Sequence, residues 1–92
     1  MSSSNFDGVK RFSCPCCGYL TLDHEANGSY DICPVCFWED DPVQLDDPAF
    51  RGGANVPSLE EARRNFLAFG AVEERYRERV RPPRAEENPE SN

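Results

Sequence analysis

Basic residues are missing from a long stretch of this chain. No lysine or arginine occurs from residue 12 to residue 50, and residues 1–50 hold nine acidic side chains against two basic ones. The whole chain of 92 residues carries a formal net charge of −7. Because a phosphate backbone is bound through clustered lysine and arginine side chains, we expect no nucleic acid to bind through the cysteine-rich first half.

Long apolar runs are missing as well. No segment approaches the roughly 20 apolar residues that a transmembrane helix needs. The start of the chain, Met1 to Asn5, is polar and lacks the apolar centre of a secretory signal. We therefore expect no membrane partner and a cytoplasmic protein, in which cysteine thiols stay reduced.

Residues suited to acid–base catalysis are scarce. His24 is the only histidine, and we expect it on the surface, near the tip of a hairpin. The acidic residues within 39–47 lack the spacing of a calcium loop, so they are expected to form a solvated loop. Only Cys16 offers a candidate nucleophile, and the sequence therefore predicts that the protein is not an enzyme.

What the chain does contain is cysteine, five residues in all. Two C-x-x-C pairs are separated by fifteen residues, a spacing typical of four-cysteine zinc sites. Each pair can direct two sulfurs at one ion, and two pairs complete a tetrahedron. The sequence therefore predicts one metal ion per chain, with Cys16 as a spare thiol. The predicted ligands are Cys14, Cys17, Cys33 and Cys36.

The identity of the metal follows from the ligand type. Four thiolates bind zinc or iron. The words Cys-Gly-Tyr and Cys-Pro-Val-Cys are similar to those of rubredoxins, which are one-iron electron carriers. In rubredoxins the two cysteine loops lie further apart and the second is also followed by glycine, whereas this chain has Phe37 there. Zinc is the predicted metal, and a rubredoxin-like iron protein is the alternative.

The first half is expected to form a small ribbon around the metal at residues 9–38, after a flexible tail at residues 1–8. Asn27-Gly28 is the strongest hairpin signal, because both residues tolerate the positive φ of a tight turn. This turn is expected to bring the second cysteine pair back to the first. Three antiparallel strands are predicted, at residues 9–13, 19–22 and 29–32.

The second half is expected to be helical at residues 58–83, after an acidic and glycine-rich loop at residues 39–57. Ser58 and Glu61 form a capping-box pattern, and Gly70 is typical of the residue that follows a helix. One helical face is predicted to pack on Phe37 and Trp38. Its apolar residues are Leu59, Ala62, Phe66 and Phe69.

The end of the chain gives a weaker pattern. A short helix is predicted near residues 72–78, followed by an extended segment and a disordered tail at residues 84–92. The arginines between Arg75 and Arg84 are expected to pair with the acidic loop of the same chain, with binding of an external anion as the alternative. The predicted fold class is a small α+β domain over residues 9–83, in which a three-stranded zinc-ribbon-like sheet precedes one or two helices.

Several uncommon words occur in order along residues 12–83. They are C-P-C-C-G-Y-x-T-L, C-P-V-C-F-W-E-D-D, R-G-G-A-N, S-L-x-x-A-R-x-N-F and V-R-P-P. In these words the chain resembles the bacterial cysteine-rich CPCC family of small proteins. The resemblance implies zinc binding through Cys14, Cys17, Cys33 and Cys36, and it implies no substrate. With a closed metal site and no catalytic set, we expect a protein-interaction module whose partner is another protein.

Overall fold

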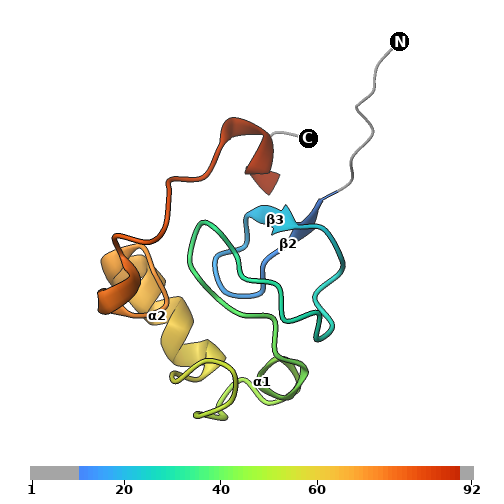
Figure 1. Cartoon of the computed structure of the whole chain (residues 1–92), viewed down its shortest axis with the longest axis vertical. Helices are drawn as coiled ribbons and strands as arrows, with labels where there is room; N and C mark the ends of the chain where they lie inside the picture. The colour runs from blue at the N-terminus through green and yellow to red at the C-terminus, as the bar shows by residue number, and fades with distance from the viewer. Residues whose placement is uncertain (1–10, 90–92) are drawn as a thin grey trace.

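The computed structural model describes residues 11–89. Its elements are short and are joined by well-defined loops (Figure 1). They are β2 (Phe12–Ser13), β3 (Leu20–Leu22), α1 (Pro42–Asp46), α2 (Leu59–Phe69) and the 3₁₀ turns η1 (Glu74–Tyr76) and η2 (Ala85–Glu87). None of the helices within this range has both the length and the apolar character that a membrane span requires.

The sheet consists of β2 and β3, which pair antiparallel on either side of the first cysteine pair. Phe12 lies opposite Leu22 and Ser13 lies opposite Leu20, with an irregularity between the two pairs. This pairing confirms an antiparallel ribbon at the first cysteine loop. Residues 9 and 10, which were expected to begin the first strand, lie outside the described residues.

The predicted third strand at residues 29–32 is wrong. Within residues 11–89 the structure shows a two-stranded sheet and, in this region, a single bridge between Ile32 and Glu39. The cause is pairing with Asp40: the N–H of Tyr30 donates to the carbonyl of Asp40 over 2.9 Å, and the N–H of Asp40 donates to the carbonyl of Asp31 over 3.0 Å. The Asp40 side chain also accepts the backbone N–H groups of residues 27–29 over 2.9–3.0 Å. The segment before the second cysteine pair is therefore held against residues 38–40, and it does not pair with β3.

The acidic loop differs from the solvated loop that the sequence predicts. Asp40 and Asp41 are buried, with 0% and 5% of their surface exposed. Asp41 caps α1 by accepting the N–H of Val43, and its other oxygen accepts the N–H of Ala54 over 2.7 Å. Both oxygens of Asp41 and the Oδ2 atom of Asp40 therefore replace water with backbone donors, which lowers the cost of burying their charge. Among the described residues, the Oδ1 atom of Asp40 is buried without a hydrogen-bond partner.

Gln44 on α1 fixes the loop that leads into α2. Its side chain is fully buried, and its amide nitrogen donates to the carbonyls of Phe50, Asn55 and Pro57, each over 3.0 Å. Its amide oxygen accepts both the backbone and the side-chain N–H of Asn55. One buried amide thus satisfies several loop groups that would otherwise lack a partner.

Helix α2 begins and ends where its sequence predicts. Ser58 and Glu61 form a capping box, and Gly70 follows the helix with a left-handed backbone. Leu59 and Ala62 are buried, but Phe69 is 38% exposed. At 3.6 residues per turn, Phe69 points about 80° around the helix axis from Leu59, at the edge of the predicted face.

The core is built around the cysteines. Trp38 is 1% exposed and lies in this core, as predicted, while Phe37 packs against it from the outside. The buried residues of the core are Cys14, Cys16, Leu22, Cys33, Val35, Cys36, Trp38, Leu59, Ala62 and Val72. Because the sulfurs and the aliphatic side chains form one cluster, the cysteine site and the stability of the fold depend on the same contacts.

The end of the described chain is more ordered than its composition predicts. The short helix expected near residues 72–78 is the 3₁₀ turn η1. The segment from residue 84, which was predicted to be disordered, contains η2, and Glu87 there is only 8% exposed. Arg81 explains this order, because its guanidinium binds both carboxylate oxygens of Glu87 over 2.9 and 2.6 Å. Residues 90–92 lie outside the described residues.

The sequence predicts that the arginines near the end of the chain pair with the acidic loop, but within residues 11–89 no such ion pair forms. Their ion pairs are local: Arg75 with Glu73, Arg77 with Glu74, and Arg81 with Glu87. Short-range pairing prevails because Asp40 and Asp41 of the loop already bind backbone groups. The proposed division into domains, with boundaries at residues 8 and 83, stays a prediction.

Candidate metal centre

Each C-x-x-C pair lies in a tight backbone loop, which we call a knuckle. In the first knuckle the N–H of Cys14 donates to the carbonyl of Tyr19 over 2.9 Å. The N–H of Gly18 returns to the carbonyl of Cys14 over 2.8 Å. Gly18 has a φ of 81°, in the left-handed region that glycine adopts at little cost.

The second knuckle repeats these bonds. The N–H of Cys33 donates to the carbonyl of Trp38 over 2.9 Å, and the N–H of Phe37 donates to the carbonyl of Cys33 over 2.8 Å. Phe37 therefore takes the position of Gly18, and it has the same left-handed backbone with a φ of 76°. The two knuckles have the same local geometry even though their sequences differ.

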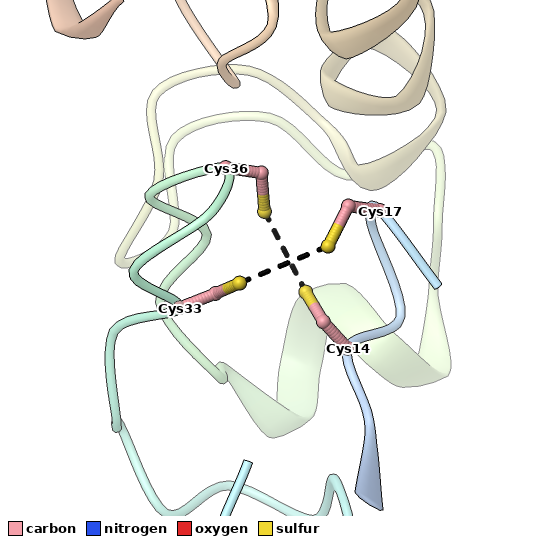
Figure 2. A group of neighbouring side chains, drawn as sticks. All are labelled: Cys14, Cys17, Cys33 and Cys36. Atoms are coloured by element: carbon pink, nitrogen blue, oxygen red, sulfur yellow. Dashed lines mark hydrogen bonds between the residues drawn. The ribbon is translucent and has the colours of Figure 1, made fainter. Parts of the chain in front are cut away.

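The two knuckles direct four sulfurs toward one point (Figure 2). The sulfurs of Cys14, Cys17, Cys33 and Cys36 all lie within 4.8 Å of one another. The Cys14–Cys36 sulfurs are 3.6 Å apart, and the Cys17–Cys33 sulfurs are 3.8 Å apart. Both distances are far longer than the roughly 2.05 Å of a disulfide bond, so the cysteines are arranged as separate ligands. This cluster could hold a metal ion.

The spacing of the sulfurs fits a metal ion that is held by four thiolates in a tetrahedron. With Zn–S bonds of about 2.3 Å, the sulfurs of a regular tetrahedron lie about 3.8 Å apart. The two measured sulfur pairs share no residue, so they correspond to opposite edges of such a tetrahedron, and both are close to this length. All four sulfurs belong to the protein, so the site has the closed ligand set of a structural metal centre.

Backbone donors stabilise negative charge on two of the sulfurs. The N–H of Cys16 donates to the sulfur of Cys14, and the N–H of Trp38 donates to the sulfur of Cys36, each over 3.4 Å. Charge-assisted bonds of this kind favour the thiolate over the thiol. The knuckle backbone is therefore shaped for thiolate ligands.

Thr21 is a residue at the site that the sequence analysis missed. Its hydroxyl lies 3.0 Å from the sulfur of Cys33, and its side chain is buried. The sequence indicated only that Thr21 belongs to a strand. The signal available was the alternation of side chains along β3. It places Thr21 on one face of the strand, and that face is directed at the cysteines for only one choice of register.

The pKa values of the cysteines describe a cluster that shares protons when no metal is bound. The neighbouring thiols, Cys14 first, donate hydrogen bonds that lower the pKa of Cys33 well below its ordinary value, and Thr21 adds to this effect. The pKa values of Cys17 and Cys36 are raised well above that value, in both cases first through the hydrogen bond to Cys14. The metal-free cluster therefore favours a thiolate at Cys33 and protons on Cys17 and Cys36.

Two other candidate residues stay outside the cluster. Cys16 is a free cysteine that lies in the core with 8% of its surface exposed. His24 is exposed and is not among the grouped ligands. These positions agree with the sequence prediction that Cys16 is the spare thiol and that His24 is a surface residue.

The comparison with known protein families covers nearly all of the described residues. A family model described as "Cysteine-rich CPCC" matches residues 12–87. The match includes all five cysteines and extends through α2 to η2. No curated protein matches the chain.

Proposed function

Because the chain belongs to the cysteine-rich CPCC family and its four cysteines cluster at one point, we propose that it binds one zinc ion in a structural site. The ligands would be Cys14, Cys17, Cys33 and Cys36. The observation that carries this proposal is the pair of sulfur distances, 3.6 and 3.8 Å, which fit opposite edges of a zinc tetrahedron. Bound zinc would offset two of the four thiolate charges and would cross-link the knuckles.

Metal content tests this proposal directly. The protein is purified without added metal or oxygen, and the metal per chain is measured by native mass spectrometry together with a visible absorption spectrum. One zinc per chain and no colour is the expected result. One iron with thiolate charge-transfer bands would replace zinc with the rubredoxin-like alternative, because four thiolates bind either metal. A metal-free chain would refute the site.

We further propose that the protein is not an enzyme and acts as a protein-interaction module, in the cytoplasm. The supporting feature is a cavity of about 80 Å³ with a mixed lining of apolar and polar residues. Its apolar residues include Phe37, Tyr76, Ile32 and Val56, and its polar ones are Glu39, Asn55, Glu73 and Arg75. Ile32 and Val56 are 48% and 52% exposed at its rim. Apolar side chains left at the rim of a small cavity are typical of a site that receives one apolar side chain of a partner.

The charge at this cavity indicates the chemistry of the partner. Glu39 lines the cavity, and within residues 11–89 its carboxylate has no ion pair. Glu73 at the same cavity pairs with Arg75. We infer a protein partner that inserts an apolar side chain and carries a basic residue next to it, because opposite charge favours association.

A photo-crosslinking amino acid at Val56, in the native host, tests the interaction. The same amino acid at Leu67, which is 85% exposed and does not line this cavity, is the control position. We expect one discrete adduct from Val56 that disappears when Ile32→Glu is added, and a purified partner that loses binding to the same variant. Equal adducts from both positions, or none from Val56, would refute the interaction surface.

A further inference from the structure

One of the four clustered cysteines differs from the other three in its exposure. Cys14, Cys33 and Cys36 are at most 1% exposed, whereas Cys17 is only partly buried. In Figure 2 all four sulfurs face the same centre, so the difference arises from what covers each residue from outside. Of the four residues, Cys17 is therefore the one in contact with solvent.

Cys17 also differs in its hydrogen bonds. Cys36 is its counterpart in the second knuckle, and it accepts the N–H of Trp38. No corresponding bond runs from Tyr19 to Cys17. Among the described residues, every other sulfur of the cluster has a hydrogen bond with a group outside the cluster, and Cys17 has none. Since such bonds stabilise the lone pairs of a thiolate, the Cys17 sulfur keeps the most reactive lone pair.

A pocket opens beside this sulfur. It has a volume of about 250 Å³ and is lined by Cys17, Gly18, Tyr19, Asn88 and Pro89. One wall belongs to the first knuckle and the other to the end of the described chain. The pocket is large enough for a small reagent to reach Cys17, and its outer wall comes from a segment about seventy residues further along the chain.

Residues 81–89, which we call the strap, form that outer wall. The strap begins at the second knuckle, where the N–H of Arg81 donates to the carbonyl of Pro34 over 3.1 Å. It then passes beside the sheet, where η2 contacts β3 (Figure 1). The strap therefore extends from one knuckle to the other.

A single side chain holds the turn of the strap in place. The Glu87 carboxylate binds the Arg81 guanidinium through both oxygens and also accepts the backbone N–H of Arg84 over 2.8 Å. Its side chain is 11% exposed, and that of Arg81 is 31% exposed. A bidentate pair with this degree of burial is stronger than a pair on the open surface.

We propose that Cys17 is the reactive site of the cluster toward soft electrophiles, and that the strap controls access to it. In the reaction, the sulfur lone pair of Cys17 forms a bond to an electrophilic carbon, and the leaving group departs with its electron pair. The product is a neutral thioether, which binds zinc more weakly than a thiolate, so modification of Cys17 releases the metal. This inference rests on the proposed metal site.

Alkylation by iodoacetamide tests the proposal on the full-length, metal-loaded protein. There the carbon–iodine bond breaks, iodide leaves, and peptide mass spectrometry identifies which cysteine has been modified at each time. A chromogenic zinc indicator follows metal release in the same sample. The strap variants are Arg81→Gln and Glu87→Gln. The matched controls are Arg79→Gln and Glu86→Gln, which change the same charges at exposed positions.

In the wild type we expect Cys17 to be modified first, and Cys16 to stay protected by burial. In both strap variants we expect Cys17 modification and zinc release to become roughly tenfold faster, the size of effect that loss of one charged hydrogen-bonded pair produces. The control variants should react at the wild-type rate. The double strap variant should react no faster than the single ones, because both substitutions break the same pair.

Two outcomes would overturn the proposal. Modification of all clustered cysteines at equal rates in a strap variant would mean that the whole domain unfolds and that the strap has no specific role. Unchanged Cys17 rates in the strap variants would mean that the strap does not control access. Metal content is measured first on every sample, so a metal-free wild type refutes the proposed function, whereas a zinc-loaded protein with either outcome refutes only this inference.

Discussion

Gly18 and Phe37 occupy the same position in the two knuckles and share a left-handed backbone, with φ angles of 81° and 76°. Glycine has no β-carbon and adopts this conformation freely. For phenylalanine it costs roughly 1–3 kcal/mol. The Phe37 ring stacks on Tyr76 with 4.4 Å between ring centroids, and this contact offsets part of the backbone strain.

This pairing can be measured as a coupling energy. We expect a double-mutant cycle of Phe37→Gly and Tyr76→Ala to show about 0.5–1.5 kcal/mol of favourable coupling, the range for aromatic pairs. Phe37→Gly should accordingly cost less stability when Tyr76 is already alanine, because the contact between the two rings is then already lost. Urea denaturation of the zinc-loaded protein gives the values. A cycle of Phe50→Ala with Tyr76→Ala serves as a control and should show no coupling.

The ligand assignment predicts opposite effects for two cysteines in the same core. Cys36→Ser should remove bound zinc and unfold the domain, because a structural zinc site contributes roughly 10–16 kcal/mol of apparent binding free energy at pH 7. Cys16→Ser should keep one zinc per chain and lower stability by about 1 kcal/mol, a common cost of a single substitution. Native mass spectrometry and circular dichroism read both effects. Equal zinc content in the two variants would show that the ligand set is wrong.

Metal binding should release protons. Thiols must lose their protons to bind zinc, and the raised pKa values of Cys17 and Cys36 keep both protonated in the metal-free protein at pH 7. Zinc affinity should therefore rise with pH and fall as the solution is acidified. Calorimetry in phosphate and in Tris, whose ionisation enthalpies differ, should give at least two protons released per zinc, one from each of these residues. The same binding enthalpy in both buffers would contradict the prediction.

The buried carboxylate of Asp40 should stabilise the fold as an anion. Burial alone would raise the pKa of Asp40, but hydrogen bonds from Ser29, Asn27 and Gly28 lower it below its ordinary value. A lowered folded pKa means that the stabilisation is complete above the unfolded pKa of about 3.9 and is lost as pH falls through the folded pKa. At pH 7 the contribution is therefore fully present.

Replacing this charge by an amide tests the contribution. We expect Asp40→Asn to lower the free energy of unfolding at pH 7 by about 1.5–3 kcal/mol, the range for hydrogen bonds to a charged group. Asp46→Asn removes the same charge at an exposed position of α1 and should change stability by less than about 0.5 kcal/mol. Urea denaturation of both variants makes the comparison. Equal effects would mean that the bonds to residues 27–29 do not stabilise the anion.

Features that depend on neighbours in the sequence were predictable. The ends of α2 follow from Ser58, Glu61 and Gly70, each of which acts on the nearest helical turn. The four clustered cysteines follow from two short, repeated loops and the length of chain between them. In both cases the physical cause lies within a few residues of the feature itself.

Features that depend on distant partners were missed. From the sequence, Asp40 looks like one more solvated acid in an acidic run. Only the folded loop shows that it binds backbone N–H groups, one of which belongs to Asn27, thirteen residues earlier. The predicted third strand fails for the same reason, since the backbone of Tyr30 and Asp31 pairs with that of Asp40 and not with β3. Glu87 likewise looks like part of a polar tail until Arg81 lies beside it.

The strap also has a consequence for the order in which the chain is made. All four clustered cysteines precede residue 37, whereas the strap starts at residue 81. During synthesis from the first residue onward, the complete ligand set leaves the ribosome while the strap is still to be translated. A metal ion could therefore reach the four cysteines on the nascent chain before the strap covers them, because the pocket at Cys17 acquires its second wall only after Asn88 and Pro89 have left the ribosome.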